Sequence, residues 1–354
     1  MLGLAGVPLG LHFRFLDPSA EAPAADVGDL VVGGLDDLAA ATSAAAGATV
    51  ITYEWEGVAA DTARTLARDV PVWPPPLALE VSQDRITEKE MFQSLGIATA
   101  PFRAVGDRTS LDAAIAALGL PAVLKTRRGG YDGKGQAVLR SAADIDAAWS
   151  ELGEVPLILE GFVPFERELS IIAVRAVDGT IACWPVVENV HEAGILRLTR
   201  APAPHLDAAL QGRAEACIRP LLEALDYVGV ACVELFDVDG VLLANEMAPR
   251  VHNSGHWTIE GAQTSQFENH LRAVLGWPLG STAACGVSAM VNCIGAMPDR
   301  VALLAVPGAH LHDYAKVPRS ARKVGHITIV AADHDQLDRS LTRVRARVAA
   351  STSG

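Results

Sequence analysis

The sequence predicts a mixed α/β and α+β protein of two or three domains, and three observations support this fold class. The chain has 354 residues, of which 50% are hydrophobic and 20% are charged, enough for more than one core. Up to about residue 75, short β-rich runs alternate with alanine-rich stretches, which is typical of a parallel sheet with crossover helices. Between residues 166 and 200, polar and apolar residues alternate, which indicates an antiparallel sheet with one face open to a cleft.

Residues 1–75 form the first predicted domain, in which strands and helices alternate. The strands are expected in DLVVG and ATVITYE, and the helices in LDDLAAATSAAAG and GVAADTARTLARD. The segment PVWPPP follows, and its prolines exclude the interior of a helix or a central strand. We therefore expect a linker at residues 71–76.

The second domain, residues 76–285, is expected to begin with a helix over 84–96 and to contain a lid subdomain at about 121–163. The predicted lid has strands AVLKT, GQAVLR and VPLILE, and a helix SAADIDAAWSEL that opens with a serine N-cap. A long helix over about 205–227 precedes the hairpin VACVELFDVDGVLLANEMAP, and the helix TSQFENHLRAVLG follows the hairpin. Residues 286–354 are expected to form a small C-terminal domain with strands VSAMVNCIG and RKVGHITIVA and a closing amphipathic helix.

Charge and cysteine content argue against several classes of protein. The net charge of −13 argues against duplex nucleic acid as a partner, because such binding needs a basic face. The apolar runs are shorter than the ~20 residues of a membrane span, and the first residues lack the features of a secretory signal, so we expect a cytoplasmic protein. We expect the five cysteines, which form no C-x-x-C pair, to be buried free thiols: Cys183, Cys217, Cys232, Cys285 and Cys293.

A glycine-rich loop with several cations, KTRRGGYDGKGQ at 125–136, joins two predicted strands. It is not a P-loop, because Arg128 occupies the position of the first glycine and Lys134 is not followed by Ser or Thr. It is not a dinucleotide fingerprint, since Val138 occupies the position of the third glycine. Two interpretations remain: an ordinary surface hairpin, or a loop whose N–H groups close over phosphate oxygens while Lys125 supplies charge.

Two carboxylates, Glu234 and Glu246, lie on the predicted hairpin. A two-residue Asp239-Gly240 turn would send them to opposite faces of the hairpin. A three-residue loop would instead pair Cys232 with Glu246 and bring Glu234 to the same face as a diagonal neighbour. Only the second register makes a joint site for a hard cation such as Mg²⁺, which proteins bind with few of their own oxygens together with substrate phosphates. The alternative is a pair of acids exposed on an edge strand.

A polar loop, APRVHNSGHW at 248–257, follows the second carboxylate strand directly. We expect its polar side chains to surround whatever the metal holds. A histidine beside an arginine suits either a proton shuttle or a hydrogen-bond donor. The alternative is a loop that satisfies its own backbone. The polar residues are Arg250, His252, Asn253, Ser254 and His256.

Taken in this order, the segments resemble the ATP-grasp superfamily and, within it, the 5-(carboxyamino)imidazole ribonucleotide synthases of purine biosynthesis. The resemblance covers nearly the whole chain and is carried by TYEWEGV, DRITEKEMF, VLKTRRGGYDGKGQ, PVVENVHEAGILR, NEMAPRVHNSGHWTIEGAQTSQFENHLRA and RKVGHI. GGYDGKGQ and APRVHNSGHW are specific to this branch. The resemblance implies an ATP-grasp fold with an N-terminal Rossmann-like pre-ATP-grasp domain and a small C-terminal β-rich domain.

The resemblance also implies the ligands and the residues that bind them. ATP would be bound together with Mg²⁺, or Mn²⁺, which Glu234 and Glu246 would hold against the phosphates. The residues implied for ATP are Arg85, Lys125, Gly130, Tyr131, Asp132, Gly133, Lys134, Gly135, Gln136, Glu160, Gly161, Phe162, Val163, Glu168, His191, Asn245 and Glu246. The residues implied for bicarbonate and aminoimidazole ribonucleotide are Glu54, Asp132, Arg250, His252, Asn253, Ser254, Lys316, Arg322 and Lys323. The implied catalytic residues are Tyr131, Lys134, Arg250, His252 and Lys323.

The implied reaction is the ATP- and bicarbonate-dependent carboxylation of aminoimidazole ribonucleotide through carboxyphosphate, by a homodimeric enzyme. One alternative is the related formate-using phosphoribosylglycinamide transformylase, or another ATP-grasp carboxylate-amine ligase. A non-catalytic nucleotide-binding protein is an alternative from a different class. Phosphate release that depends on bicarbonate distinguishes the first interpretation from the others.

The chain departs from the pattern at two places. Many other superfamily members have asparagine two residues after the second metal carboxylate, where this chain has Ala248. Family members also open with a strand and a turn of the form G-G-G-Q-L-G-R, whereas this chain begins at the following helix with MLGLAGVPLGL. We therefore expect the first domain to lack that strand and turn, and the chain to bind Mg-ATP but to use the ribonucleotide poorly.

Overall fold

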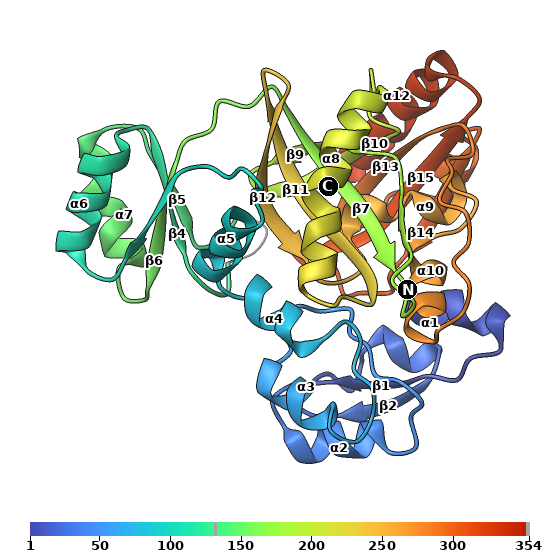
Figure 1. The fold of residues 1–354 in the computed structure, drawn as a ribbon. Helices are drawn as coiled ribbons and strands as arrows, with labels where there is room; N and C mark the ends of the chain where they lie inside the picture. Colours follow the sequence, from blue (N-terminus) through green and yellow to red (C-terminus); the bar gives the residue numbers. More distant parts are fainter. Residues whose placement is uncertain (131–132, 352–354) are drawn as a thin grey trace.

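Three groups of elements follow one another along the chain in the computed structural model, which describes residues 1–130 and 133–351. An N-terminal group lies at the bottom of Figure 1, a small four-stranded sheet lies at its left, and a large sheet with its helices fills the rest. The predicted mixture of α/β and α+β architecture is confirmed.

The N-terminal group contains a parallel pair of strands, β1 (Arg14–Asp17) and β2 (Asp29–Val32). Its helices are α1 (Leu2–Gly6), α2 (Leu38–Ala45) and α3 (Ala60–Leu66), with short 3₁₀ turns η1 (Val7–Leu9) and η2 (Pro23–Asp26). The predicted strand in ATVITYE is wrong, because only a single parallel bridge forms there, between Ile51 and Val72. The predicted linker at 71–76 ends in a helix, α4 (Pro76–Ser82), since proline is well suited to the first helical position.

Helix α5 (Arg85–Ser94) confirms the helix predicted over 84–96. The side chain of Asp84 caps it by accepting the backbone N–H of Ile86 at 3.1 Å. Arg85, Glu88 and Lys89 fall on one face at i, i+3 and i+4, and the helix turns this face toward the large sheet.

The small sheet is antiparallel, with strand order β3-β6-β4-β5. Helices α6 and α7 pack on it and bury the cluster that includes Leu111, Leu124 and Leu159. The sheet includes β3 and therefore starts before residue 121, where the lid was expected to begin. The elements are β3 (Phe102–Val105), α6 (Arg108–Leu118), β4 (Ala122–Thr126), β5 (Gln136–Leu139), η3 (Ala142–Asp144), α7 (Ile145–Leu152) and β6 (Leu157–Gly161).

The large sheet has nine strands in the order β12-β11-β7-β9-β10-β13-β15-β14, with β8 paired to β7. All of its pairings are antiparallel. The strands are β7 (Arg167–Arg175), β8 (Ile181–Cys183), β9 (Val187–Glu192), β10 (Ile195–Ala201), β11 (Gly229–Val238), β12 (Val241–Ala248), β13 (Val287–Ile294), β14 (Ala309–Asp313) and β15 (Lys323–Ala331). The C-terminal strands thus continue the same sheet, because β13 pairs directly with β10.

Helices cover both faces of the large sheet. Helix α8 (Ala208–Ala224) packs against Ile171 and Val233, whereas α10 (Gln266–Val274) packs against Ile172 and Cys232 on the opposite face. The expectation of one open face is therefore wrong for the middle of β7, which is buried on both sides. Only the first two residues of β7, Arg167 and Glu168, are polar and partly exposed at this end of the strand. The remaining helices are η4 (Asn253–Gly255), α9 (Thr258–Gly261), α11 (Arg300–Leu304) and α12 (His334–Ser351).

The cysteines and the helix lengths bear on the expectations from composition. All five cysteines are free thiols, and Cys217, Cys232 and Cys293 are buried as expected. The expectation is wrong for Cys285, which is exposed, and Cys183 is only half-buried. Over the described ranges, none of the helices combines the length and the apolar character needed to span a bilayer.

Candidate active site

The hairpin of β11 and β12 brings two carboxylates together, but by a register that differs from the predicted one. Val238 pairs with Val241, so the turn has two residues, Asp239 and Gly240. Their φ values are 50° and 78°, the left-handed conformation that a tight hairpin turn requires at both positions. Of the two turns considered, the two-residue turn is therefore the one that forms.

A bulge on β12 restores the shared face. Leu235 pairs with Ala244 whereas Glu234 pairs with Glu246, so Asn245 is an extra residue on β12. Without this bulge, the two-residue turn would place Asn245 opposite Glu234 and turn the Glu246 side chain to the other face. Glu234 and Glu246 are thus direct partners on one face rather than the diagonal neighbours that were expected.

The charges of this pair are compensated unequally. The guanidinium of Arg85 lies 2.8 Å from the carboxylate of Glu246. Burial opposes ionisation of Glu246, but Arg85 outweighs it and lowers the pKa of that carboxyl. Burial, followed by the negative charge of Glu246, raises the pKa of Glu234 to about 7. A cation placed between the two carboxylates would relieve this repulsion.

The donor set fits a hard divalent cation that also binds the substrate. Among residues 1–130 and 133–351, no group of three or more His, Cys, Asp or Glu side chains is arranged to hold a metal ion. A protein site of only two carboxylates suits Mg²⁺, which completes its shell with water and phosphate oxygens. It does not suit a structural Zn²⁺, which takes four protein donors. Ala248, on the same strand as Glu246, adds no side-chain oxygen.

Two lysines flank Glu160 where the small sheet meets α5. Lys125 Nζ lies 3.0 Å from one carboxylate oxygen of Glu160, and Lys89 Nζ lies 3.5 Å from the other. Burial alone would raise the pKa of Glu160, but the two lysines outweigh it and the pKa is lowered. Burial also lowers the pKa of Lys89, which is only 1% exposed. Lys125, predicted to meet phosphate, is thus held beside the strand that leads to the predicted adenine segment.

The predicted adenine segment, 160–163, lies between the two sheets. Strand β6 ends at Gly161, whose N–H donates to the carbonyl of Pro101 at 2.8 Å. Phe162 is 40% exposed just beyond the strand, and β7 begins at Arg167. The N–H of Phe162 is also engaged, with the carbonyl of Pro121 at 3.2 Å, so the exposed surface at this junction is the aromatic side chain of Phe162.

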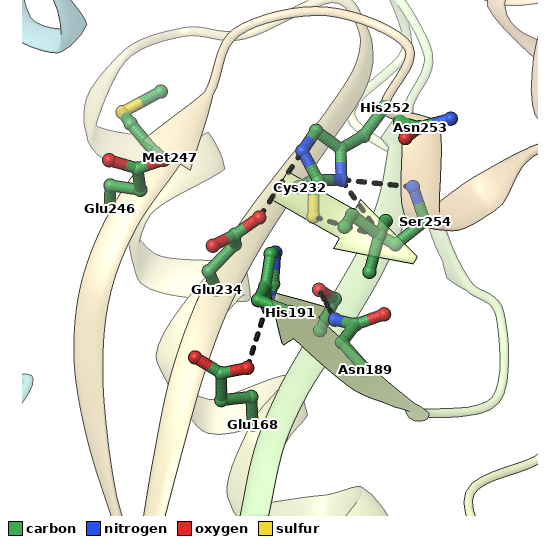
Figure 2. Close-up of polar contacts among 12 residues, drawn as sticks. Glu168, Asn189, His191, Cys232, Glu234, Glu246, Met247, His252, Asn253 and Ser254 are labelled. Carbon is green, nitrogen blue, oxygen red and sulfur yellow. Dashed lines mark hydrogen bonds and ion pairs between the residues drawn. The ribbon is translucent and has the colours of Figure 1, made fainter. Parts of the chain in front are cut away.

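Glu168 and His191 form a pair across β7 and β9 (Figure 2). Nδ1 of His191 lies 2.7 Å from the Glu168 carboxylate. Burial disfavours the charged imidazole, but Glu168 and the nearby Glu234 outweigh this and raise the pKa of His191. The structure therefore brings both predicted nucleotide-binding residues to the face that carries the carboxylate pair.

His252 faces Glu234 as a neutral imidazole. Its Nε2 lies 3.4 Å from the Glu234 carboxylate, and Figure 2 shows the two side chains pointing toward each other. Nδ1 accepts the backbone N–H of Ser254 at 3.3 Å, so Nε2 carries the proton. Burial, together with Arg250, lowers the pKa of His252 well below its usual range. The side chain is therefore a hydrogen-bond donor toward the cleft.

The rest of the polar loop is engaged within the protein. Ser254 is fully buried, and its hydroxyl lies 2.8 Å from Nδ1 of His252. The amides of Asn253 and Asn292 exchange two hydrogen bonds, at 3.1 and 2.7 Å. His256 lies 2.9 Å from the Asn253 amide. Asn253 and Ser254 therefore shape the loop in this arrangement, and the substrate contacts expected of them stay predictions.

The basic residues predicted for the ribonucleotide lie near the first domain and β15. The Arg250 guanidinium pairs with Glu56 and donates to the carbonyl of Val251 at 3.0 Å. Lys316 lies over the Tyr314 ring at 5.3 Å from its centroid. Burial, then Arg322, lowers the pKa of Lys316.

Three further residues predicted for this side are Lys323, Arg322 and Glu54. Lys323 begins β15, and Arg322 donates to the carbonyl of Val317 at 3.1 Å. Glu54, predicted to lie near the ribose, accepts the backbone N–H of Leu2 at 2.6 Å. The structure thus brings Glu54 and the basic residues to one side of the cleft, away from Lys125 and Glu160.

The glycine loop approaches the cleft from the small sheet. A Cβ on Gly133 would lie 2.7 Å from the carbonyl oxygen of Ala193, at the β9–β10 turn, so a larger residue could not approach so closely. Gly135 also has no side chain, and its carbonyl accepts the N–H of Thr126 at 2.8 Å. Gln136 begins β5 opposite Lys125, Lys134 lies two residues before it in the loop, and the carbonyl of Gly130 accepts from Arg85 at 3.5 Å. The predicted residues Tyr131 and Asp132 lie outside the described residues.

Four residues of this region were missed by the sequence analysis. Glu88 and Lys89 contact β12 and Glu160, Glu56 pairs with Arg250, and Asn292 supports Asn253. The spacing of Glu88 and Lys89 from Arg85 would have placed them on one helix face. Nothing in the sequence would have identified their partners on a strand more than 150 positions later.

Comparison with known proteins gives one consistent family. Three family models match in series: the ribonucleotide synthetase preATP-grasp domain over residues 1–83, the ATP-grasp domain over 90–267, and the phosphoribosylaminoimidazole carboxylase C-terminal domain over 288–340. The N5-carboxyaminoimidazole ribonucleotide synthase of Pseudomonas aeruginosa is 52% identical over 350 residues, covering 99% of this chain and 96% of the relative. That of Brucella melitensis is 47% identical over 334 residues, covering 93% and 92%.

Solved structures give the same result. The N5-carboxyaminoimidazole ribonucleotide synthetase of Thermus thermophilus superimposes with a TM-score of 0.94 at 55% identity, covering 98% of this chain and 95% of that one. The enzyme of Aspergillus clavatus in complex with ADP and 5-aminoimidazole ribonucleotide gives a TM-score of 0.92 at 31% identity, covering 99% and 95%.

Proposed function

The chain belongs to the N5-carboxyaminoimidazole ribonucleotide synthases, ATP-grasp ligases of purine biosynthesis, and we propose that it carboxylates aminoimidazole ribonucleotide with the residues of the cleft described above. One observation carries the assignment of the site. Two carboxylates on adjacent strands face the same cleft as Arg85, Lys125 and the neutral His252. This combination can hold a metal-bound polyphosphate on one side and an acceptor on the other.

ATP binding exchanges ion-pair partners on the nucleotide side. Without ligand, Arg85 neutralises Glu246 and Lys125 neutralises part of Glu160. We assign the phosphates of ATP to Arg85 and Lys125, with the adenine against the junction at 160–163 and its ribose beside Glu168. Each cation then has a phosphate partner, and Glu246 is free to bind a cation.

Glu234 and Glu246 are the residues we assign to Mg²⁺. When bound, the metal would neutralise charge on the phosphate oxygens as the phosphoryl group is transferred. Mn²⁺ has the same preference for carboxylate and phosphate oxygens and would substitute. Glu246 adds to the effect of burial in raising the pKa of Glu234, and a cation bound to both carboxylates would offset their repulsion.

The chemistry proceeds in two steps whose atoms balance. A bicarbonate oxygen attacks the γ-phosphorus of ATP, the bond to the β-phosphate oxygen breaks, ADP leaves, and bicarbonate gives up its proton. The amine nitrogen of the ribonucleotide then attacks the carboxyl carbon of carboxyphosphate, the carbon–oxygen bond breaks, and the amine proton leaves with inorganic phosphate. We assign Arg250, Lys323 and Lys134 to the negative charge of these species, and His252 Nε2–H to a hydrogen bond that orients an oxygen beside Glu234.

A coupled assay tests this function. ADP formation should require both bicarbonate and aminoimidazole ribonucleotide, and N5-carboxyaminoimidazole ribonucleotide should accumulate in the same ratio. ADP formation that depends on formate and glycinamide ribonucleotide would instead identify a transformylase. Binding of ATP with no turnover under any of these conditions would identify a nucleotide-binding protein without catalysis.

We also propose the setting in which the enzyme works. Its substrates are ATP, bicarbonate and a ribonucleotide, all small molecules of the cytoplasm, where we place the protein. We propose a homodimer, by analogy with the family resemblance. Light scattering coupled to gel filtration would measure a mass of two chains of 37.1 kDa each if the proposal is right, and of one chain if it is wrong.

A further inference from the structure

Helix α5 contacts three consecutive residues of β12 at its bulge. Lys89 Nζ donates to the carbonyl of Asn245 at 3.2 Å. Arg85 Nη1 donates to the side chain of the next residue, Glu246, at 2.8 Å. The carboxylate of Glu88 accepts the backbone N–H of the third residue, Met247, at 2.7 Å. One face of one helix turn thus holds the backbone on both sides of Glu246 as well as its carboxylate.

The bulge needs such contacts because of its place in the sheet. β12 is the first strand in the strand order of the large sheet, and its outer edge meets a single parallel bridge, between Thr99 and Ala244, just before the bulge. A bulge leaves backbone groups outside the ladder, and buried backbone donors and acceptors must find partners. Glu88 and Lys89 supply one acceptor and one donor at the two residues that flank Glu246.

Placing Glu88 and Lys89 at this buried position costs folding free energy unless both side chains have specific partners. Their exposures are 2% and 1%, and burial of ionisable side chains is unfavourable unless they are paired and hydrogen-bonded. On the same helix, Phe92 fills the core with an apolar side chain in the ordinary way. A helix that only had to pack against the sheet would be apolar at all three positions.

We propose that Glu88 and Lys89 are positioning residues, which fix the β12 bulge and thereby keep Glu246 on the same face as Glu234 for metal binding. The inference rests on the proposed function, in which these two carboxylates hold the metal. Lys89 extends the arrangement to the nucleotide, because its ammonium also pairs with Glu160, the partner of Lys125. Loss of either residue lets the strand return toward a regular register, in which Glu246 leaves the shared face.

Mn²⁺ binding in the presence of saturating ADP, followed by electron paramagnetic resonance, tests the proposal together with steady-state kinetics. Glu88→Ala should weaken Mn²⁺ binding by about tenfold or more, the usual effect of removing a group that orients a metal ligand. kcat should fall together with the affinity for Mn²⁺, whereas the affinity for ADP measured in EDTA should change little. Glu88→Gln keeps an amide oxygen that accepts the Met247 N–H, and should bind Mn²⁺ close to the wild-type level. Lys89→Met removes the donor to Asn245 but keeps the apolar stem of the side chain. It should lower the affinity for Mn²⁺ as much as Glu88→Ala does.

Two matched variants on the same helix separate positioning from stability. Glu90→Ala, at an exposed position, should change neither Mn²⁺ affinity nor the melting temperature. Phe92→Leu should lower the melting temperature but leave Mn²⁺ affinity unchanged. The proposal is overturned if Glu88→Ala and Lys89→Met both bind Mn²⁺ like the wild type, if Glu88→Gln loses as much affinity as Glu88→Ala, or if Phe92→Leu weakens Mn²⁺ equally.

Glu246→Gln distinguishes failure of this inference from failure of the metal assignment. If Glu246→Gln lowers Mn²⁺ affinity and the α5 variants do not, the positioning role is wrong and the metal pair stands. If Glu246→Gln binds Mn²⁺ like the wild type, the metal pair itself is wrong, and the positioning role falls with it.

Discussion

The two sides of the cleft avoid the cost of buried charge in different ways. On the nucleotide side, cations and carboxylates are paired within the protein, as in Arg85 with Glu246 and Lys125 with Glu160. On the ribonucleotide side, the histidines of the polar loop are uncharged, because burial lowers the pKa of His256 to about 3 and that of His252 well below its usual range. The nucleotide side relies on ion pairs, whereas on the other side the histidines of the polar loop are kept neutral and Arg250 pairs with the partly exposed Glu56.

The difference predicts which substitutions disturb folding and which disturb only function. Removing one member of a buried ion pair leaves its partner uncompensated, so variants on the nucleotide side should lose stability as well as activity. On the other side His252 is neutral and the partner of Arg250, Glu56, is partly exposed, so variants there should lose function with little loss of stability. The following experiments test this distinction.

The largest effect is expected at the carboxylate pair. Glu234→Gln and Glu246→Gln should each lower the rate of ADP formation by at least about a hundredfold, since a bound metal contributes several kcal/mol to transition-state charge stabilisation. Their stabilities should move in opposite directions: Glu234→Gln removes repulsion and should raise the melting temperature, whereas Glu246→Gln removes the partner of Arg85 and should lower it. Glu223→Gln, at an exposed position of α8, is the control. Near-normal turnover in either variant would refute the metal assignment.

The next effect concerns the stability of the nucleotide side. Glu160→Gln leaves Lys89 and Lys125 without their shared carboxylate, and should lower the free energy of unfolding by about 3 kcal/mol. Glu268→Gln breaks the half-exposed pair with Arg272 and should lower it by less than about 1 kcal/mol. Urea titration measures both. Equal losses of unfolding free energy in the two variants would mean that the burial of Glu160 and its lysines does not increase their contribution to stability.

An intermediate effect is expected on the ribonucleotide side. Arg250→Met should raise KM for the ribonucleotide by about tenfold or more, the usual worth of a charge-assisted hydrogen bond, and should leave the affinity for ADP unchanged. Glu56, its partner, has 31% of its side chain exposed and can be hydrated, so the melting temperature should change little. A parallel loss of ADP affinity would show that the two sides of the cleft are not independent.

The smallest effect is expected at Ser254. Ser254→Ala removes the hydroxyl beside His252 but keeps the backbone N–H that fixes the tautomer, so kcat/KM should fall by no more than about threefold, the cost of one weak hydrogen bond. The kcat/KM of His252→Ala should fall much further in the same assay. A loss at Ser254→Ala as large as that at His252→Ala would mean that the hydroxyl, not the backbone, sets the imidazole.

Much of the fold could be predicted because its periodicities are strong. The apolar runs of β7 and β11, the capped helix α5 and the alternation in the first domain all follow local rules. ATVITYE has the composition of a strand but forms only a bridge at Ile51, because its pairing is decided by neighbours and not by propensity. Pro76 was taken as part of a linker although proline is compatible with the first turn of a helix.

The site was predictable in its residue types but less so in its geometry. Glu234 and Glu246 could be expected to share a face only if the register allowed it, and the register depends on a bulge at Asn245. A bulge has no reliable sequence signal when its partners lie far away in the chain, here Glu88 and Lys89. Ser254 and Asn253 were assigned to the substrate from their position in a polar loop, which cannot tell a side chain that faces the cleft from one that holds the loop together.

The pairing of β13 with β10 has a consequence for shortened chains. Leu198 of β10 lies in one hydrophobic cluster with Ala289, Ile327 and Leu341, so the C-terminal strands share both hydrogen bonds and core with the strands before them. A chain ended at residue 285 would expose the edge of β10 and leave Leu198 without the rest of that cluster, and should aggregate rather than fold as an independent unit. The large sheet is therefore continuous from β12 to β14, whereas the small four-stranded sheet is joined to it by two segments of the chain, between α5 and β3 and between β6 and β7, and by contacts such as that of Lys89 with Glu160.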